Sequence, residues 1–284
     1  MKPIYIGNVH EVYNISERQL VIVSTDRMSV HGKTIPMPIK DKGIILTEIS
    51  NFWFNLTKDI IPNHLLETRN DHMPCFFHDK RFYRRTVLVK KLKIIPYEFI
   101  VRGYMYGRLW DNYSEGKDLC GVHLSNPNYQ LASKLDSPII TPTIKLDHAR
   151  DKNTNLSEVS AKLGSNVTDY LCNVSLSLYK RCSEIAKKKG IIIADTKFEF
   201  GIDEQNEILL ADEIFTPDSS RFWDAATYQV GQSPKSFDKQ LIRDWLSNNK
   251  KGNEFQYDKI PREIIERTEE IYASCHKRLL TDGQ

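Results

Sequence analysis

Several features that assign a protein to a broad class are missing from this sequence of 284 residues. No apolar run approaches the roughly 20 residues of a membrane-spanning helix. The opening Met1-Lys2-Pro3-Ile4-Tyr5 also lacks the apolar core of a signal peptide. The five cysteines are scattered and none forms a C-x-x-C pair, which is typical of reduced cytosolic thiols. We therefore expect a cytoplasmic protein with no membrane partner.

A strong excess of one charge is missing too. The 40 Lys and Arg residues and 37 Asp and Glu residues leave a net charge of +3, which is too small to predict a nucleic-acid-binding face. Because 40% of the residues are hydrophobic and 27% are charged, the composition is that of a globular protein with a sizeable core. We expect no nucleic-acid partner and, from the length, one large domain or two lobes.

The common nucleotide-binding signatures are also absent. The sequence contains no G-x-x-x-x-G-K-[ST] and no G-x-G-x-x-G after a strand, and it has neither H-R-D nor D-F-G. These absences exclude a P-loop and leave a Rossmann fold or a typical protein kinase unsupported. Any nucleotide chemistry must therefore use a different kind of site.

What the sequence does contain is a charged hairpin at residues 191–223. The β-branched run Ile191–Ile193 predicts a strand, and Asp195, Lys197 and Glu199 follow it at alternate positions. Alternate side chains of a strand share one face, so these three charged groups would project together. The opposite, apolar face would carry Ala194, Phe198 and Phe200.

The polar turn Asp203-Glu204-Gln205-Asn206 would connect this strand to a returning strand over Glu207–Phe215. In that register Lys197 lies opposite Asp212. Carboxylates gathered around an ammonium suit Mg²⁺ with a polyphosphate, since Mg²⁺ favours a few carboxylates plus phosphate oxygens. The alternative is a solvated face on a half-buried hairpin, but the flanking apolar runs favour a covered sheet.

The rest of the chain mixes strand and helix patterns, which predicts an α+β fold. Strands are expected at residues 20–23, 86–89 and 98–102. Helices are expected at residues 49–56, 167–185, 238–247 and 261–280. A long loop is expected from about residue 112 to 155. We divide the chain into a strand-rich N-terminal lobe, residues 1–93, and a mixed C-terminal lobe, residues 94–284.

Basic residues near these strands are candidate anion ligands. Lys90 and Lys91 could reach phosphates while the backbone edge of their strand bonds an adenine; the alternative is a solvated strand edge. The polar turn before Arg221 could hold an anion through its backbone N–H groups and this guanidinium. Arg102 is a second candidate, and the alternative for it is an ordinary ion pair.

Four long blocks of the sequence resemble the long form of the phosphoribosylaminoimidazole-succinocarboxamide (SAICAR) synthetase family. They are residues 88–93 with Arg102-Gly103, then 195–201, 212–223 and 237–245, and the resemblance extends from about Gly7 to Leu246. It implies a fold related to ATP-grasp enzymes and kinases, with ATP between two lobes. It also implies an ATP-dependent ligase of purine synthesis, which activates the carboxylate of carboxyaminoimidazole ribotide as an acyl phosphate and joins it to the amine of aspartate.

The resemblance implies roles for individual residues. Asp195 and Lys197 match catalytic groups beside the reacting phosphate, and Glu199 and Asp212 match the Mg²⁺ ligands. ATP-binding positions are matched by Gly7, Val9, Leu88, Lys90 and Glu98. Substrate-binding positions are matched by Ser29, Arg102, Arg108, Lys145, Asn153, Asp218 and Arg221. The expected ligands are ATP, Mg²⁺, a ribotide-like carboxylate and an amino acid, and the protein would be a monomer or a homo-oligomer.

The substrate side departs from the family pattern. Gly7–Glu11 lacks the two basic residues of the family motif, and Asp26–Gly32 lacks the aspartate of the next one. Arg108 stands where a small residue is expected near the ribotide phosphate. The family's Ser-Thr-Lys-Ala-Glu reads Thr143–Asp147 here. Its His-Asp-Glu-Asn reads Lys152–Asn155, unless a shift of one residue places Asp151 in that motif.

Three hypotheses follow. The chain is an ordinary SAICAR synthetase with tolerated substitutions, or a relative that uses the same chemistry on a different carboxylate or amine, which Arg108 favours. The third is a catalytically inactive nucleotide-binding relative that regulates a partner. The retained Asp195, Lys197, Glu199 and Asp212 speak against the third, because an inactive protein has little reason to keep a costly charged cluster.

Overall fold

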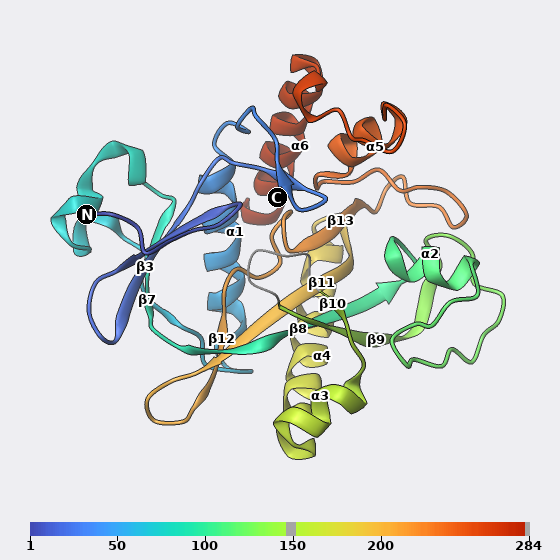
Figure 1. Cartoon of the computed structure of the whole chain (residues 1–284), viewed down its shortest axis with the longest axis horizontal. Helices are drawn as coiled ribbons and strands as arrows, with labels where there is room; N and C mark the ends of the chain where they lie inside the picture. The colour runs from blue at the N-terminus through green and yellow to red at the C-terminus, as the bar shows by residue number, and fades with distance from the viewer. Residues whose placement is uncertain (146–151, 282–284) are drawn as a thin grey trace.

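The computed structural model describes residues 1–145 and 152–281, and most of its strands form two antiparallel sheets (Figure 1). The N-terminal sheet has the strand order β1-β2-β3-β7-β6. Its strands are β1 (Tyr5–Ile6), β2 (His10–Asn14), β3 (Gln19–Ser24), β6 (Leu65–Glu67) and β7 (Thr86–Lys90). A separate short hairpin consists of β4 (Ser29–Val30) and β5 (Lys33–Thr34).

The second sheet carries the charged hairpin. Its order is β10-β9-β8-β11-β12, and β13 also pairs with β11. Its strands are β8 (Lys93–Tyr104), β9 (Lys134–Ile144), β10 (Lys152–Asn153), β11 (Ile191–Ile202), β12 (Ile208–Ala211) and β13 (Ser220–Asp224). The long loop expected from residue 112 to 155 is wrong, because β9 occupies 11 of its positions. Pairing with β8 outweighs the low strand propensity of the Asp and Pro residues in β9.

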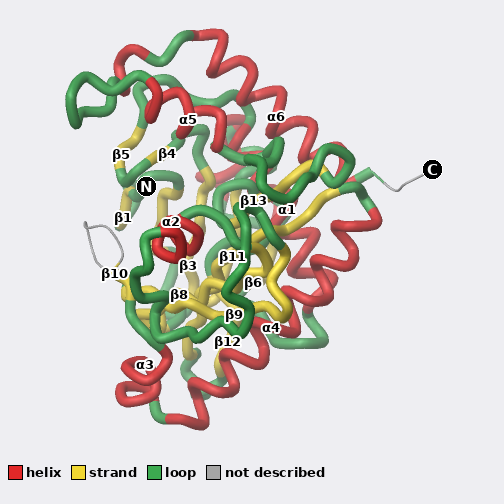
Figure 2. The backbone as a smooth tube through the Cα atoms, turned by 90° about the vertical axis from the view of Figure 1, so that its right-hand side faces the viewer, coloured by secondary structure: helices red, strands yellow, loops and turns green. Residues whose placement is uncertain are grey.

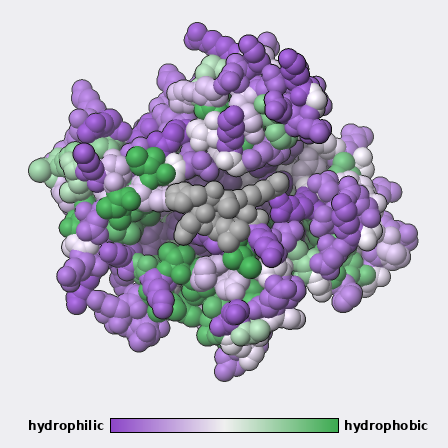
Figure 3. Space-filling view, viewed as in Figure 1, coloured by the Kyte–Doolittle hydropathy of each residue, from purple (hydrophilic) through white to green (hydrophobic). Residues whose placement is uncertain are grey.

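Six α-helices accompany the sheets: α1 (Lys42–Thr57), α2 (Arg108–Ser114), α3 (Leu156–Leu163), α4 (Ser165–Lys188), α5 (Gln240–Asn248) and α6 (Arg262–Leu280). Helix α4 packs across β11 and β8 and lies on the other side of the sheet from α2 (Figure 2). The helices expected at 167–185, 238–247 and 261–280 are confirmed, and α1 is longer than expected. No helix in the described ranges is long and apolar enough to cross a membrane, and the face in Figure 3 is mostly hydrophilic.

The main core lies between α4, α1, α6 and the second sheet. Phe198 and Phe200 of β11 are completely buried in it, and so is Trp53 of α1. Helix α1, which belongs to the N-terminal part of the chain, therefore packs in the same core as C-terminal elements. The first sheet ends at Lys90 and the second begins at Lys93, but the division into lobes at residues 93 and 94 stays a prediction.

The hairpin turns at residues 203–206 as expected, but its returning strand is short. Glu199 pairs with Ala211, and β12 ends there because Asp212 adopts a left-handed backbone with φ of 61°. The strand expected over Glu207–Phe215 is thus wrong in its second half. Lys197 does not lie opposite Asp212 in a ladder; the turned backbone brings the two side chains together instead.

Candidate active site

Strand β11 arranges its charged residues in two rows across the sheet. In one row Arg102 of β8 and Arg221 of β13 both lie opposite Asp195 of β11. In the other row Glu98 of β8 lies opposite Glu199 of β11. We call the first set, Arg102, Asp195 and Arg221, the arginine row. The second set, Glu98 and Glu199 with the nearby Asp212, is the carboxylate row.

A β-bulge separates the apolar residues of β11 into two groups. The register shifts between Ile193 and Asp195, so residues on either side of the shift no longer keep the same alternation. Phe198 and Phe200 pack in the main core as predicted, whereas Ala194 packs with Tyr106 and Trp223 in a different cluster. The prediction that Ala194 shares one face with Phe198 and Phe200 is therefore wrong.

Lys197 lies between the members of the carboxylate row. Its ammonium donates hydrogen bonds to Glu98 Oε1 at 3.0 Å, Glu199 Oε1 at 2.5 Å and Asp212 Oδ2 at 3.3 Å. The Nζ of Lys145 lies 2.5 Å from the other oxygen of Glu199. Burying so many charged groups is costly unless they are paired, and here each carboxylate has a cationic partner.

The pKa values follow from this crowding. Burial works against the charged form of Lys197, but Glu199, Glu98 and Asp212 outweigh it and raise the pKa of the ammonium well above its ordinary value. Burial and the charge of Asp212 raise the pKa of Glu199. Burial also opposes ionisation of Asp212, but Lys197 and His10 hold the pKa of this carboxyl below its usual range. Of the neighbouring carboxyls Asp212 and Glu199, Asp212 therefore ionises more readily, and its negative charge makes Glu199 ionise less readily.

These carboxylates fit a hard divalent cation. Glu199 and Asp212 offer oxygen donors, and a cation would relieve the repulsion that raises the pKa of Glu199. Within residues 1–145 and 152–281, no three His, Cys, Asp or Glu side chains are arranged to bind a metal ion by themselves. A cation here would therefore take further oxygen ligands from a phosphate-bearing substrate, which is usual for Mg²⁺.

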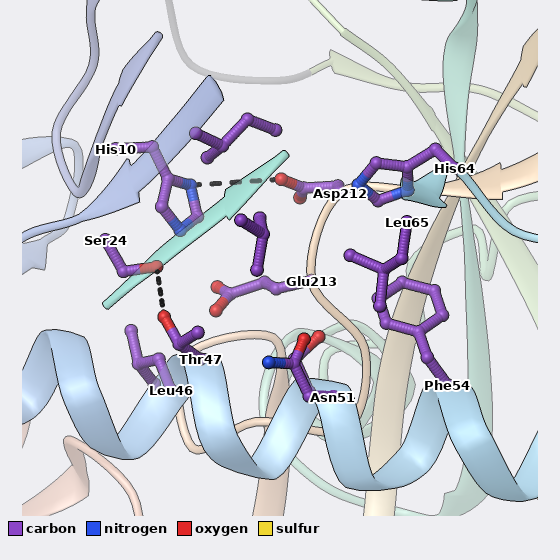
Figure 4. A pocket seen from close by; sticks show the side chains of 13 residues that line it. His10, Ser24, Leu46, Thr47, Asn51, Phe54, His64, Leu65, Asp212 and Glu213 are labelled. Carbon is purple, nitrogen blue, oxygen red and sulfur yellow. Dashed lines mark hydrogen bonds and ion pairs between the residues drawn. The ribbon is translucent and has the colours of Figure 1, made fainter. Parts of the chain in front are cut away.

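Next to Asp212, the side chain of Glu213 faces a small cavity beneath the N-terminal sheet. Figure 4 shows His10, Asp212 and Glu213 around this space of about 30 Å³, closed below by α1. Glu213 Oε2 is buried without a hydrogen-bond partner in the described part of the chain. Burial, followed by the charges of Asp218 and Asp212, raises the pKa of Glu213 to about 8. Near pH 7 this raised pKa favours the protonated, uncharged form of Glu213.

The arginine row lines a much larger cavity, of about 650 Å³, together with Lys197. Both guanidiniums bond the same oxygen of Asp195, Arg102 at 3.3 Å and Arg221 more closely. Burial lowers the pKa of Arg102, with the charge of Asp195 acting in the opposite direction. Two cations that share one carboxylate leave an excess of positive charge, which suits an anionic group of a ligand.

Most predicted substrate-binding residues meet at this cavity. Arg108 and Asn153 line its wall, and Arg108 donates a 2.7 Å hydrogen bond to Asn153 Oδ1. Ser29 and Asp218 do not line the wall: Ser29 lies in β4, and Asp218 is buried in a separate ion-pair cluster. The predicted motif residues Asp147 and Asp151 lie outside the described residues.

The predicted ATP-binding residues lie on neighbouring strands and loops, and Glu98 is the one that also lines the large cavity. The carbonyls of Gly7 and Val9 accept hydrogen bonds from Arg27 and Thr25. Lys90 pairs with Asp203 at 3.3 Å. Leu88 lies in β7, where its backbone pairs with β3 and β6, and an adenine-bonding backbone edge on the strand predicted over residues 88–92 stays a prediction.

Several cavity residues were not predicted individually as site residues, although His31 and Thr143 lie in segments whose departure from the family pattern the sequence shows. They include His31, Tyr106, Trp110, Asp111, Thr143, Gln240, Arg243 and Ser247. Gln240, Arg243 and Ser247 share one face of α5, and their spacing of three and four residues could have signalled a polar helix face turned toward a ligand. For His31 the only signal is the departure of its segment from the family pattern; its position comes from the β4–β5 hairpin and from stacking on Phe255, with 4.5 Å between the ring centroids.

Comparison with known proteins gives one consistent result. A family model described as SAICAR synthetase matches residues 3–260. The phosphoribosylaminoimidazole-succinocarboxamide synthase of Methylobacillus flagellatus is 42% identical over 283 residues, which cover 98% of this chain and 94% of that protein. The enzyme of that name from Saccharomyces cerevisiae is 39% identical over 285 residues, with 96% and 92% covered. The solved SAICAR-synthase from Saccharomyces cerevisiae complexed with SAICAR has a TM-score of 0.87 at 36% identity, covering 99% of this chain and 95% of its own.

These matches confirm the resemblance stated from the sequence, the α+β fold that it implies, and the enzyme class, an ATP-dependent carboxylate–amine ligase. The alternative of a catalytically inactive relative finds no support in them. The chain belongs to the SAICAR synthetase family.

Proposed function

We propose that the protein joins the carboxylate of carboxyaminoimidazole ribotide to the amine of aspartate while ATP is converted to ADP and phosphate. The observation that carries this proposal is the position of Lys197, which lies on the same strand face as the carboxylate row and the arginine row. The carboxylate row suits a cation bound to a polyphosphate, and the arginine row suits the phosphate of a ribotide. The similarity to a yeast structure described as complexed with SAICAR supports this assignment.

In the first step a carboxylate oxygen of the ribotide attacks the γ-phosphorus of ATP. A bond from that oxygen to phosphorus forms, the bond to the bridging oxygen of ADP breaks, and an acyl phosphate results. Lys197 neutralises the charge that gathers on the transferring group, because the surrounding carboxylates keep its ammonium protonated. Mg²⁺ bound by Glu199 and Asp212 would supply further charge neutralisation and orient the phosphates.

In the second step the amine of aspartate attacks the acyl carbon. The carbon–nitrogen bond forms, phosphate leaves with the electrons of the carbon–oxygen bond, and it carries away the proton that the amine loses. The protein contributes mainly by holding both reactants in register. We assign Arg102 and Arg221 to the ribotide phosphate, and Asp195 to orienting these two guanidiniums. That is a positioning role, in place of the direct catalytic role implied by the family resemblance.

The remaining predicted residues take supporting roles in this proposal. Lys145, now paired with Glu199, would turn toward a substrate carboxylate once a cation binds that glutamate. Ser29 would act through its neighbour His31, which lines the cavity, and Asn153 would orient Arg108.

For ATP, we propose that Gly7 and Val9 cover the phosphates and that Glu98 lies near the ribose. Leu88 would contact the base through its side chain, because its backbone is used by the sheet. Lys90 would exchange its partner Asp203 for a phosphate. The five free cysteines support the cytosolic location expected from the sequence.

A second candidate function rests on Arg108. A guanidinium lines the cavity where the family has a small residue, and this difference in size and charge favours a different substrate. In this alternative the enzyme performs the same two steps on a different carboxylate or amine. If carboxyaminoimidazole ribotide is the substrate, Arg108 binds its phosphate as a third guanidinium beside Arg102 and Arg221.

The experiment is a comparison of substrates. The purified protein is incubated with ATP, Mg²⁺, carboxyaminoimidazole ribotide and aspartate, and both ADP and the mass of the amide product are measured. A panel of other ribotide carboxylates and amino acids is run in parallel. Rapid turnover with carboxyaminoimidazole ribotide and aspartate supports the proposal. Faster turnover with another pair supports the second candidate, and no turnover with any pair while ATP still binds refutes both.

A further inference from the structure

The carboxylate of Asp218 lies outside the wall of the large cavity, next in sequence to the wall residue Ser219, and three other elements meet around it. Its Oδ2 is 2.9 Å from Nζ of Lys42, at the start of α1, and 3.7 Å from Nζ of Lys239, just before α5. Its Oδ1 accepts a 2.7 Å hydrogen bond from the hydroxyl of Tyr272 in α6. The side chain of Asp218 is 3% exposed, and Lys42 and Tyr272 are completely buried.

The turn that contains Asp218 is also fastened to the active-site strand. The carbonyl of Ser219 accepts a hydrogen bond from the backbone N–H of Lys197 at 3.1 Å. Ser220 donates a 2.8 Å hydrogen bond to the hydroxyl of Thr196. Immediately after the turn, Arg221 reaches Asp195 in the arginine row. The turn therefore lies between the buried cluster on one side and the cavity on the other.

Through these contacts the buried side chain of Tyr272 in α6 is connected to residues of the cavity wall. A buried carboxylate with paired cations and a hydroxyl donor keeps one geometry, because losing any partner leaves charge uncompensated. Tyr272 lies outside the cavity wall and cannot touch a ligand there. Its hydroxyl nevertheless donates a hydrogen bond to Asp218, which lies in the turn that precedes Arg221.

We infer that Tyr272 is a positioning residue of the active site, which acts through Asp218 to hold residues 216–220 and thereby Arg221. The role assigned to Asp218 changes accordingly: it anchors the turn from below and does not bind substrate directly. The kinetic consequence of this inference rests on the proposed function. The structural consequence, a loosened turn when the hydroxyl is removed, does not.

The first test is hydrogen exchange of the backbone amides of Thr216 and of residues 218–221 in Tyr272→Phe; Pro217 between them has no amide hydrogen. Exchange should become about tenfold faster, as expected from losing a hydrogen bond to a charged group. Thr268→Val is the matched control, because Thr268 is also buried in α6 but its hydroxyl bonds the carbonyl of Ile264. Unchanged exchange in Tyr272→Phe, or an equal acceleration in the control, would overturn the inference.

The second test separates the two substrates. In Tyr272→Phe the KM for carboxyaminoimidazole ribotide should rise about tenfold while the KM for ATP stays within about twofold, because Arg221 belongs to the ribotide side. Equal changes in both KM values would indicate general destabilisation and contradict a positioning role. If the wild-type protein does not use this ribotide, the proposed function fails, and the exchange experiment alone decides the inference.

Discussion

The ammonium of Lys197 and the carboxylate of Asp212 lie 3.3 Å apart although 15 positions separate them in the sequence. The contact depends on the left-handed backbone of Asp212, which ends β12 and turns the carboxylate toward β11. A non-glycine residue in this conformation is strained, and such strain is concentrated at functional sites. Replacing Asp212 should therefore lower catalytic activity much more than it lowers the stability of the fold.

We predict that Asp212→Asn lowers kcat about a thousandfold and weakens Mg²⁺-dependent ATP binding, because one of the two cation ligands is lost. The neighbouring Glu213→Gln is the control. Since the raised pKa of Glu213 favours its protonated form near pH 7, which the amide resembles, activity should stay within about threefold of the wild type. Turnover and calorimetric ATP titrations with and without Mg²⁺ measure both effects. Near-normal activity of Asp212→Asn would remove the carboxylate row from the mechanism.

Stability should depend on pH through Glu213. Its pKa is raised from 4.5 to about 8 in the folded protein, so between these values the folded chain holds a proton that the unfolded chain has lost. The free energy of unfolding therefore falls as pH rises through this window, by at most about 1.4 kcal/mol per pH unit for one proton. Above the window the loss is complete.

Urea unfolding of the wild type and Glu213→Gln, in EDTA across this pH range, measures that dependence. The variant cannot ionise at this position, so its free energy of unfolding should fall less steeply with pH. The difference between the two proteins isolates Glu213 from the other titrating groups. Parallel curves would show that Glu213 ionises normally in the folded protein.

Arg108 should contribute to binding of the ribotide phosphate. We predict that Arg108→Ser raises the KM for carboxyaminoimidazole ribotide about tenfold with little change in kcat, since a charge-assisted contact to the bound substrate is lost. The corresponding nucleoside, which lacks the phosphate, should show no such difference between wild type and variant. An exposed arginine that does not line the cavity, Arg262, supplies the control Arg262→Ser. A lower KM in Arg108→Ser would favour the candidate with a different substrate.

The sequence predicts the local parts of this site and fails on the parts that depend on distant pairing. Alternation along β11 places Lys197 and Glu199 together because a strand has a fixed period of two. The arginine row could not be predicted, since it depends on the register of β8 and β13 against Asp195. The left-handed Asp212 also escapes prediction, and so does β9, where pairing overrides composition. Resemblance placed Asp218 among the substrate ligands, whereas tertiary packing surrounds it with Lys42 and Tyr272.

The most direct test of the central claim follows oxygen from the carboxylate. Carboxyaminoimidazole ribotide labelled with ¹⁸O in its carboxylate is incubated with the protein, ATP, Mg²⁺ and aspartate, and the released phosphate is analysed by ³¹P NMR. If an acyl phosphate forms, one labelled oxygen passes from the carboxylate to each phosphate released. Phosphate without label, formed together with the amide product, would contradict this account of the chemistry at Lys197.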